Sequence, residues 1–118
     1  MPLSIRDFKV YVPAKDFELS KRFYSALGFK MSAGWGGTAD FELNGYRFRL
    51  QDYYVKDWAD NFMVVIGVED AEAWHLHVCM IAASGDFAGV RVKPPEIVDG
   101  SLVLHVWDPS GVLLVFVQ

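Results

Sequence analysis

The strongest constraint on the fold is that one short pattern occurs twice along the chain. Asn44-Gly45 and Asp108-Pro109-Ser110-Gly111 are turn-forming runs, and an apolar-rich stretch follows each of them. Before each turn the chain shows the same succession of a strand pattern, a helix pattern and further strand patterns. The sequence therefore predicts two modules of order βαβββ, one over about residues 1–57 and one over about residues 58–118, within a single domain.

In the first module, Ile5 to Val12 alternates in the manner of a strand, and Pro13 is expected to end it because proline lacks a backbone donor. Asp16 predicts the start of a helix that ends at Leu27, before Gly28. The remaining strands are predicted at residues 29–33, 39–43 and 46–52, and Asn44-Gly45 joins the last two as a hairpin.

In the second module, a predicted strand at residues 62–68 precedes Asp70, a helix-capping residue. Trp74, Val78 and Ile81 then form one apolar helical stripe before Gly85. Further strands are predicted at residues 90–93, 101–107 and 112–117, with Pro94-Pro95 as a break and residues 58–60 as the linker between modules. Each sheet would carry a helix on one face, so we expect an α+β fold in which curved mixed sheets form a cleft and the helices lie outside.

Composition narrows the classes of partner. With 53% hydrophobic residues in 118, the chain has ample material for a packed core. A net charge of −4 with scattered Lys and Arg argues against nucleic acid. No apolar run reaches the roughly 20 residues of a membrane span, residues 1–12 lack the apolar stretch of a signal peptide, and Cys79 is the single cysteine. We therefore expect a cytoplasmic protein whose partners are small molecules or other proteins, with no membrane contact.

The two modules also carry the residue pattern of a known superfamily. The residues that carry the resemblance in the first module are Val10-Tyr11-Val12, Asp16, Ser20, Phe23-Tyr24 and Leu27-Gly28-Phe29. Together they resemble the first-module pattern of the vicinal oxygen chelate superfamily. The run Asp108-Pro109-Ser110-Gly111 resembles the closing turn of the same superfamily. The superfamily contains glyoxalase I, bleomycin resistance proteins, extradiol dioxygenases and fosfomycin resistance enzymes. The resemblance spans essentially the whole chain and implies the glyoxalase/bleomycin resistance fold and a homodimer. It does not name a substrate, because one fold supports many chemistries.

The resemblance also indicates where a metal would be held. Enzymes of this superfamily typically bind one divalent ion with side chains from the first and last strands of each module. Counting from the helix starts and from the turn glycines places these positions at Lys9, Arg49, Met63 and Val115, none of which is a usual metal ligand. We therefore predict no metal and no other cofactor, as in the bleomycin resistance proteins that the chain resembles, which sequester a drug without chemistry.

Two of these four positions hold cations. Lys9 and Arg49 facing one cleft would repel each other unless an anion or a carboxylate intervened. One interpretation is a binding site for a carboxylate, phosphate or phenolate, with Arg49 as a planar fork and Lys9 as a point charge. The alternative is that Asp40 or Glu42 on a neighbouring strand neutralises Arg49, or that both cations reach solvent.

Aromatic residues supply the other candidate contacts. If Val115 faces the cleft, antiparallel pairing puts His105 and Trp107 on the same side. A histidine there could contact a ligand, transfer a proton or serve only the structure. Tyr11 and Trp35 are the further rings that we expect a ligand to meet.

The leading hypothesis is a metal-free, small-molecule-binding homodimer of the sequestration or resistance type, with an anionic or aromatic ligand and no assigned catalytic residue. Its predicted ligand-binding residues are Lys9, Tyr11, Trp35, Arg49, His105 and Trp107. One alternative is a metal-dependent lyase or isomerase of the glyoxalase I type, with ligands such as Glu42, Gln51 or His105. Another is an interaction module that uses the aromatic residues between Tyr53 and Trp58 as a contact surface.

Overall fold

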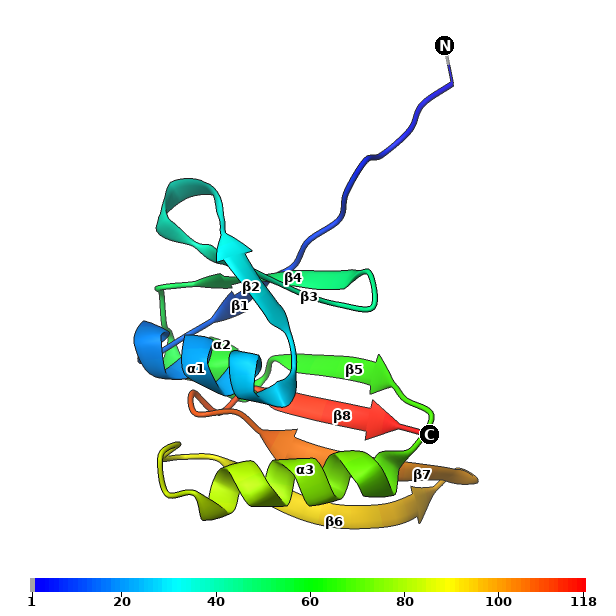
Figure 1. Ribbon diagram of the computed structural model, residues 1–118. Coiled ribbons are helices and arrows are strands. Elements are labelled where there is room, and N and C mark those ends of the chain that lie inside the picture. The colour runs from blue at the N-terminus through cyan, green and yellow to red at the C-terminus, as the bar shows by residue number, and fades with distance from the viewer. Residues whose placement is uncertain (1) are drawn as a thin grey trace.

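The computed structural model describes residues 2–118, whose strands form two separate four-stranded sheets (Figure 1). The first sheet has the strand order β1 (Tyr11–Pro13), β4 (Tyr46–Gln51), β3 (Ala39–Leu43), β2 (Lys30–Ala33). The second has the order β5 (Met63–Gly67), β8 (Leu113–Val117), β7 (Ser101–Trp107), β6 (Arg91–Val98). The helices are α1 (Phe17–Leu27), the short α2 (Lys56–Asp60) and α3 (Ala71–Ala83), with a single 3-10 turn at Trp35–Gly37.

The two modules repeat the same pairing scheme, as the sequence predicts. In each, the first strand runs parallel to the last and the other pairs are antiparallel. Tyr11 lies opposite Arg49 in the first sheet, and Val65 lies opposite Val115 in the second. The predicted α+β fold of two βαβββ modules is therefore confirmed.

The helix ends follow from their capping residues. The side chain of Asp16 accepts a hydrogen bond from the backbone N–H of Leu19 at 3.1 Å, and Asp70 accepts one from Ala73 at 3.0 Å. Gly28 ends α1 with a φ of 119°, a conformation that a side chain would strain. Both predicted N-terminal caps are confirmed, and they fix which face of each helix meets its sheet.

A polar joint connects the modules inside the core. Tyr24 on α1 is buried and donates a hydrogen bond to Asp108 at 2.5 Å. Asp108 also accepts the backbone N–H groups of Ser110 and Val112 at 2.8 and 3.0 Å, and its side chain is fully buried. Ser20 lies 3.3 Å from Ser110. The closing turn of the second module is thus held against the helix of the first.

The predicted strand from Ile5 to Val12 is wrong over most of its length, because β1 begins only at Tyr11. Residues 2–8 are exposed and leave the body as an extended arm (Figure 1), so their alternating pattern finds no sheet edge within this chain. The strand ends at Pro13 as predicted, and Pro13 itself is its last residue, paired with Gln51. β1 is an edge strand, where a missing backbone donor is tolerated.

Two smaller boundaries also differ from the prediction. Residues 58–60, expected as a plain linker, form the end of α2. The strand expected at residues 90–93 continues to Val98 through Pro94-Pro95, where the pairing with β7 shifts register. β6 is an edge strand, and a bulge there accommodates the prolines. Within residues 2–118 we find no helix long and apolar enough to cross a membrane.

Candidate ligand-binding faces

Each sheet has one face packed against a helix and one face turned away from it. On β4, Phe48 packs toward α1, with its ring 4.8 Å from that of Tyr24, and Leu50 is fully buried. Arg47 and Arg49 alternate with these residues and therefore lie on the opposite face. We call this the charged face of the first sheet; it consists of Lys9, Tyr11, Asp40, Arg47 and Arg49.

Asp40 is the centre of the charged face. It accepts hydrogen bonds from Nε and Nη2 of Arg49 at 2.7 and 3.2 Å and from Nζ of Lys9 at 3.0 Å. The three side chains keep only 15–20% of their surface exposed. The alternative in which Asp40 neutralises Arg49 is therefore what the structure has, while the carboxylate of Glu42 instead accepts the backbone N–H of Gly45 at 2.6 Å.

These contacts stabilise the charged forms of all three groups. The Arg49 hydrogen bonds lower the pKa of Asp40 below its usual value, and Lys9 adds to this effect. The pKa of Lys9 is raised by its bonds to Asp40 and Asp7, and that of Arg49 is raised by Asp40 and Tyr11. The cluster therefore stays ionised throughout the neutral range.

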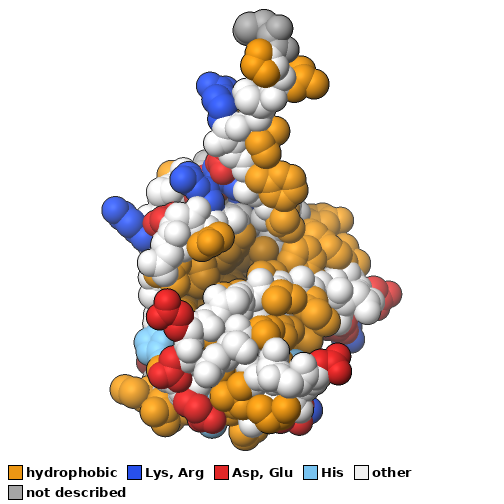
Figure 2. Space-filling view, turned by 90° about the vertical axis from the view of Figure 1, so that its right-hand side faces the viewer, with side chains coloured by type: hydrophobic (Ala, Val, Ile, Leu, Met, Phe, Trp, Pro, Cys, Tyr) orange, Lys and Arg blue, Asp and Glu red, His pale blue; other side chains and the backbone are white. Residues whose placement is uncertain are grey.

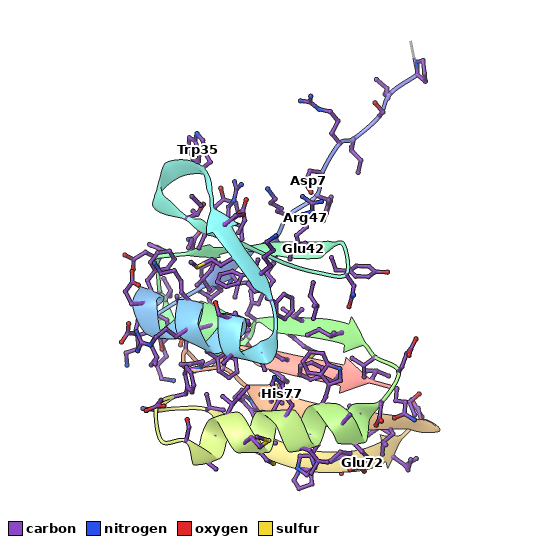
Figure 3. All side chains as sticks on the ribbon, in the orientation of Figure 1. Asp7, Trp35, Glu42, Arg47, Glu72 and His77 are labelled. Carbon is purple, nitrogen blue, oxygen red and sulfur yellow. The ribbon has the colours of Figure 1, made fainter. Side chains whose placement is uncertain are left out.

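The arm is anchored to the same face at its base. Asp7 lies 3.1 Å from Nζ of Lys9 and 3.8 Å from Nε of Arg47, so the chain crosses the charged face before it leaves (Figure 3). Tyr11 receives a hydrogen bond from Nη1 of Arg49 at 3.3 Å, and the guanidinium lies 5.6 Å from its ring centroid. Lys9, Tyr11 and Arg49 are thus brought together, as predicted.

The corresponding face of the second sheet, turned away from α3, combines aromatic, apolar and basic side chains. His105 lies opposite both Val115 and Lys93, which confirms the predicted orientation of His105 relative to Val115. The rings of His105 and Trp107 are 6.3 Å apart and inclined by 24°. The guanidinium of Arg91 lies 4.5 Å from the ring centroid of Trp107. We call these residues the aromatic face.

His105 has one polar atom with no partner. Its Nδ1 is buried and makes no hydrogen bond to any described residue. A buried polar atom without a partner is costly, and such atoms are few in folded proteins. His105 is therefore the residue on the aromatic face that keeps an unsatisfied hydrogen-bonding atom.

The four positions predicted from the superfamily's metal site are divided between the two sheets. Lys9 and Arg49 lie on the charged face, while Met63 and Val115 lie on β5 and β8. Among residues 2–118 no three His, Cys, Asp or Glu side chains gather in a way that could hold a metal ion. The donor atoms at these positions do not fit a divalent ion, since two are cationic and one is an alkyl group.

Two predicted contact residues lie elsewhere. Trp35 is 77% exposed on the 3-10 turn and points away from the body at the tip of its loop (Figure 3). Trp58 packs its ring 5.8 Å from Phe62 and 6.2 Å from Tyr53, so it is partly covered within the chain. Of the other predicted ligand-binding residues, Lys9, Tyr11 and Arg49 lie at the first sheet, and His105 and Trp107 lie in the second.

One hollow has a volume of about 960 Å³, and its lining includes Arg47 of the charged face. It opens between the β3–β4 hairpin and β5, and Tyr24, Phe48, Ile66 and Trp74 form part of its apolar lining. These side chains belong to the helix side of the sheets. None of the six predicted ligand-binding residues lines this hollow.

Solved structures share this fold along almost the whole chain. A bleomycin-binding protein in complex with bleomycin is 19% identical, with a TM-score of 0.78 and coverage of 97% of this chain and 98% of the other. TnmS3, an antibiotic-binding protein from Streptomyces sp. CB03234, is 21% identical, with a TM-score of 0.77 and coverage of 99% and 98%. A lactoylglutathione lyase from Agrobacterium tumefaciens is 14% identical, with a TM-score of 0.69 and coverage of 99% and 94%.

No protein-family model and no curated protein matches the sequence. The structural matches confirm the predicted resemblance to the vicinal oxygen chelate superfamily at the level of the fold. They include both binding proteins and an enzyme, so the fold by itself leaves the chemistry open.

Sequence reasoning missed three charged residues on these faces. Asp7 and Arg47 belong to the ion network at the base of the arm, and Arg91 covers Trp107. The period of two offered a signal for the first pair, because Asp7 and Arg47 each precede a predicted cleft residue by two positions. Arg91 was hidden because its pairing with Trp107 depends on the register of β6, which no local pattern fixes.

Proposed function

We propose that this protein binds a small aromatic molecule with an anionic group, and that it does so without a metal. The observation that carries the proposal is the charge of the cluster around Asp40. The partly buried cations Lys9 and Arg49 share the single carboxylate of Asp40, so these three side chains carry one net positive charge, while the more exposed Arg47 and Asp7 offset each other. A partly buried cation with fixed geometry favours an anion such as a carboxylate or phenolate.

The aromatic face supplies the second half of the proposed site. Trp107 and His105 offer nearly parallel rings on which a planar ligand can stack. The unpartnered Nδ1 of His105 adds one polar contact near these rings. The bleomycin-binding protein and TnmS3, which share the fold, are binding proteins, and this supports binding rather than catalysis here.

We further propose that a homodimer closes the cleft. The charged and aromatic faces belong to separate sheets, so a site that uses both needs them brought together. The arm carries Leu3, Ile5 and Phe8, which are 76–100% exposed, and Met63 and Val65 on β5 are 59% and 65% exposed. Figure 2 shows the hydrophobic side chains along the arm as it stands clear of the body. Exposed apolar side chains of this kind favour association.

The test is equilibrium binding of paired aromatic probes, monitored by tryptophan fluorescence. Each pair consists of an aromatic carboxylate and its uncharged amide, so that only the charge differs. Preference for the carboxylates, lost in Arg49→Gln but kept in Arg22→Gln on the exposed side of α1, is the expected result. Equal affinity for acid and amide in the wild type would overturn the anionic part of the proposal.

The lyase alternative has its own test in the same protein. A glyoxalase-type reaction needs a metal, so the isolated protein is supplied with nickel or zinc and assayed with the hemithioacetal of glutathione and methylglyoxal. Turnover that follows metal loading would favour the lyase alternative. It would also mean that residues other than those at the four expected positions hold the metal.

A further inference from the structure

Helix α3 is apolar on two opposite sides. Its inner side packs on the second sheet: Val78 and Ile81 are buried, and Trp74 stacks on Phe116 at 4.9 Å. Its outer side carries Leu76 and Met80, which are 67% and 74% exposed. A surface helix of a monomer normally turns a polar side to water, so the outer side of α3 is anomalous.

The matching helix of the first module shows what an uncovered outer side looks like. α1 exposes Glu18, Arg22 and Ser25, and Glu18 pairs with Lys21 at 2.8 Å. The two helices have the same place in their modules, so the fold itself does not require an apolar outer side. The difference is specific to the sequence of α3.

The outer apolar residues follow the spacing of a helix-pairing seam. Ala73, Leu76, Met80 and Ala83 are separated by three, four and three residues, the spacing of positions that meet a second helix. All four are exposed. The two alanines lie at the ends of this stripe, and the larger Leu76 and Met80 lie in the middle. The sequence of side-chain sizes is therefore the same when the stripe is followed from either end.

We propose that α3 pairs with α3 of a second copy, antiparallel, about a two-fold axis at the level of Val78. In that register Ala73 lies opposite Ala83 of the second copy, and Leu76 lies opposite Met80. An interface that matches itself in this way is the kind that forms between identical subunits. The large central residues fill the middle, while the alanines let the helix ends approach.

The charges favour the antiparallel direction. A parallel pair would bring both copies of Glu72 to the same end of the seam, whereas the antiparallel pair separates them to opposite ends. His77 does not interfere, because it turns toward α1 and lies 2.9 Å from the carbonyl oxygen of Ala26 (Figure 3). The stripe between the helix ends carries no charge.

This contact is distinct from the dimer proposed to close the cleft. α3 covers the side of the second sheet opposite His105 and Trp107, so both contacts fit on one chain. A three-turn helix pair is smaller than the roughly 800 Å² per partner of a standard interface. We therefore expect a weak, concentration-dependent association that joins cleft dimers into larger species, because each cleft dimer presents two copies of α3.

Cys79 provides a direct test, because it is the sole cysteine and is exposed. It lies on α3 one residue from the proposed axis, so the two copies of Cys79 lie near each other on the same flank of the seam. A short bis-maleimide should join two full-length chains in high yield. The matched control, Cys79→Ser with Glu18→Cys on the outer side of α1, should give only the background yield.

A second test uses the seam itself. Leu76→Lys and Met80→Lys should each weaken the α3-dependent association at least tenfold in sedimentation equilibrium and reduce the cross-linking yield, while Met31→Lys, at another partly exposed methionine, should not. Melting curves will verify that the variants stay folded. Cross-linking of the wild type at the background yield, or association unchanged by both seam variants, would overturn the proposal. Loss of the cleft dimer alone would leave an association that is still sensitive to Leu76→Lys.

Discussion

Tyr24 donates a hydrogen bond to Asp108 across the boundary between the two modules, at 2.5 Å and out of contact with solvent. Tyr24 belongs to α1 and Asp108 to the turn that closes the second module. The bond therefore links residues 84 positions apart in sequence and ties the two repeats into one core. Because both groups are buried, loss of this hydrogen bond should measurably lower the free energy of unfolding.

Tyr24→Phe removes this bond and leaves a buried carboxylate oxygen without its strongest donor. We expect a loss of about 1–3 kcal/mol in the free energy of unfolding, measured by urea denaturation. Tyr46→Phe is the matched control, because Tyr46 is 79% exposed and should lose almost nothing. Equal stability of the two variants would mean that the bond contributes nothing beyond packing.

Asp108 should also make stability depend on pH. Burial raises the pKa of its carboxyl to about 6, against the bonds from Tyr24 and the turn that lower it. Because this folded-state pKa lies above the usual value, the stabilising contribution is complete below about pH 4 and is lost as the pH rises through about 6. A shift of about two units corresponds to roughly 3 kcal/mol.

The check is the free energy of unfolding of the wild type and of Asp108→Asn, measured between pH 4 and pH 8. The asparagine does not titrate, so the wild type should be most favoured relative to the variant at low pH and lose that advantage toward neutrality. Two parallel curves would show that Asp108 titrates near its ordinary pKa.

On the charged face, substitutions of Arg49 and Asp40 should change the affinity for an anionic ligand in opposite directions. Arg49→Gln removes a cation and should weaken binding of an aromatic carboxylate about ten- to hundredfold. Asp40→Asn removes the carboxylate that holds Lys9 and Arg49, so it should strengthen binding of the same probe. Affinities from calorimetry decide the matter, and weaker binding in both variants would indicate that the cluster serves only to hold the fold.

The sequence predicted correctly those features that depend on residues close together in the chain, and it failed where pairing with distant residues decides the structure. The helix starts at Asp16 and Asp70 and the turn at Asn44-Gly45 are local, because capping and turn formation involve residues within a few positions. The arm was mispredicted for the opposite reason. Its alternation is a true strand pattern, but a strand also needs an edge to pair with, and the chain offers none to residues 2–8.

The candidate site shows the same limit. The alternation of β4 placed Arg49 on the outward face from sequence alone, and the pairing of β7 with β8 placed His105 opposite Val115. Whether Arg49 met a ligand or a carboxylate depended on the register of β3 against β4, which sets Asp40 directly opposite. Both interpretations, an anion site and neutralisation by a carboxylate, therefore stayed open on the sequence alone.

Metal addition tests the predicted absence of a cofactor. Melting temperatures of chelator-treated protein, with and without nickel, zinc, manganese or iron(II), should coincide, because Lys9, Arg49, Met63 and Val115 offer no usual ligand. Nonspecific binding is controlled with magnesium. A large stabilisation by one ion alone would mean that other residues hold a metal, and the enzyme alternative would take precedence.

The arm provides the last prediction. Deleting residues 2–8 removes the apolar Leu3, Ile5 and Phe8 together with Asp7, which contacts Lys9 and Arg47. If these apolar side chains are covered in a homodimer, the truncated chain should dissociate at concentrations where the full chain stays dimeric, as sedimentation equilibrium would record. Asp7→Asn is the control for the lost charge, since it keeps the apolar residues and removes only the ion pairs. The truncated chain could instead remain a dimer with the same sensitivity to dilution as the full chain. In that case the apolar arm residues do not contribute to the cleft-closing contact, which would then lie on the sheets alone.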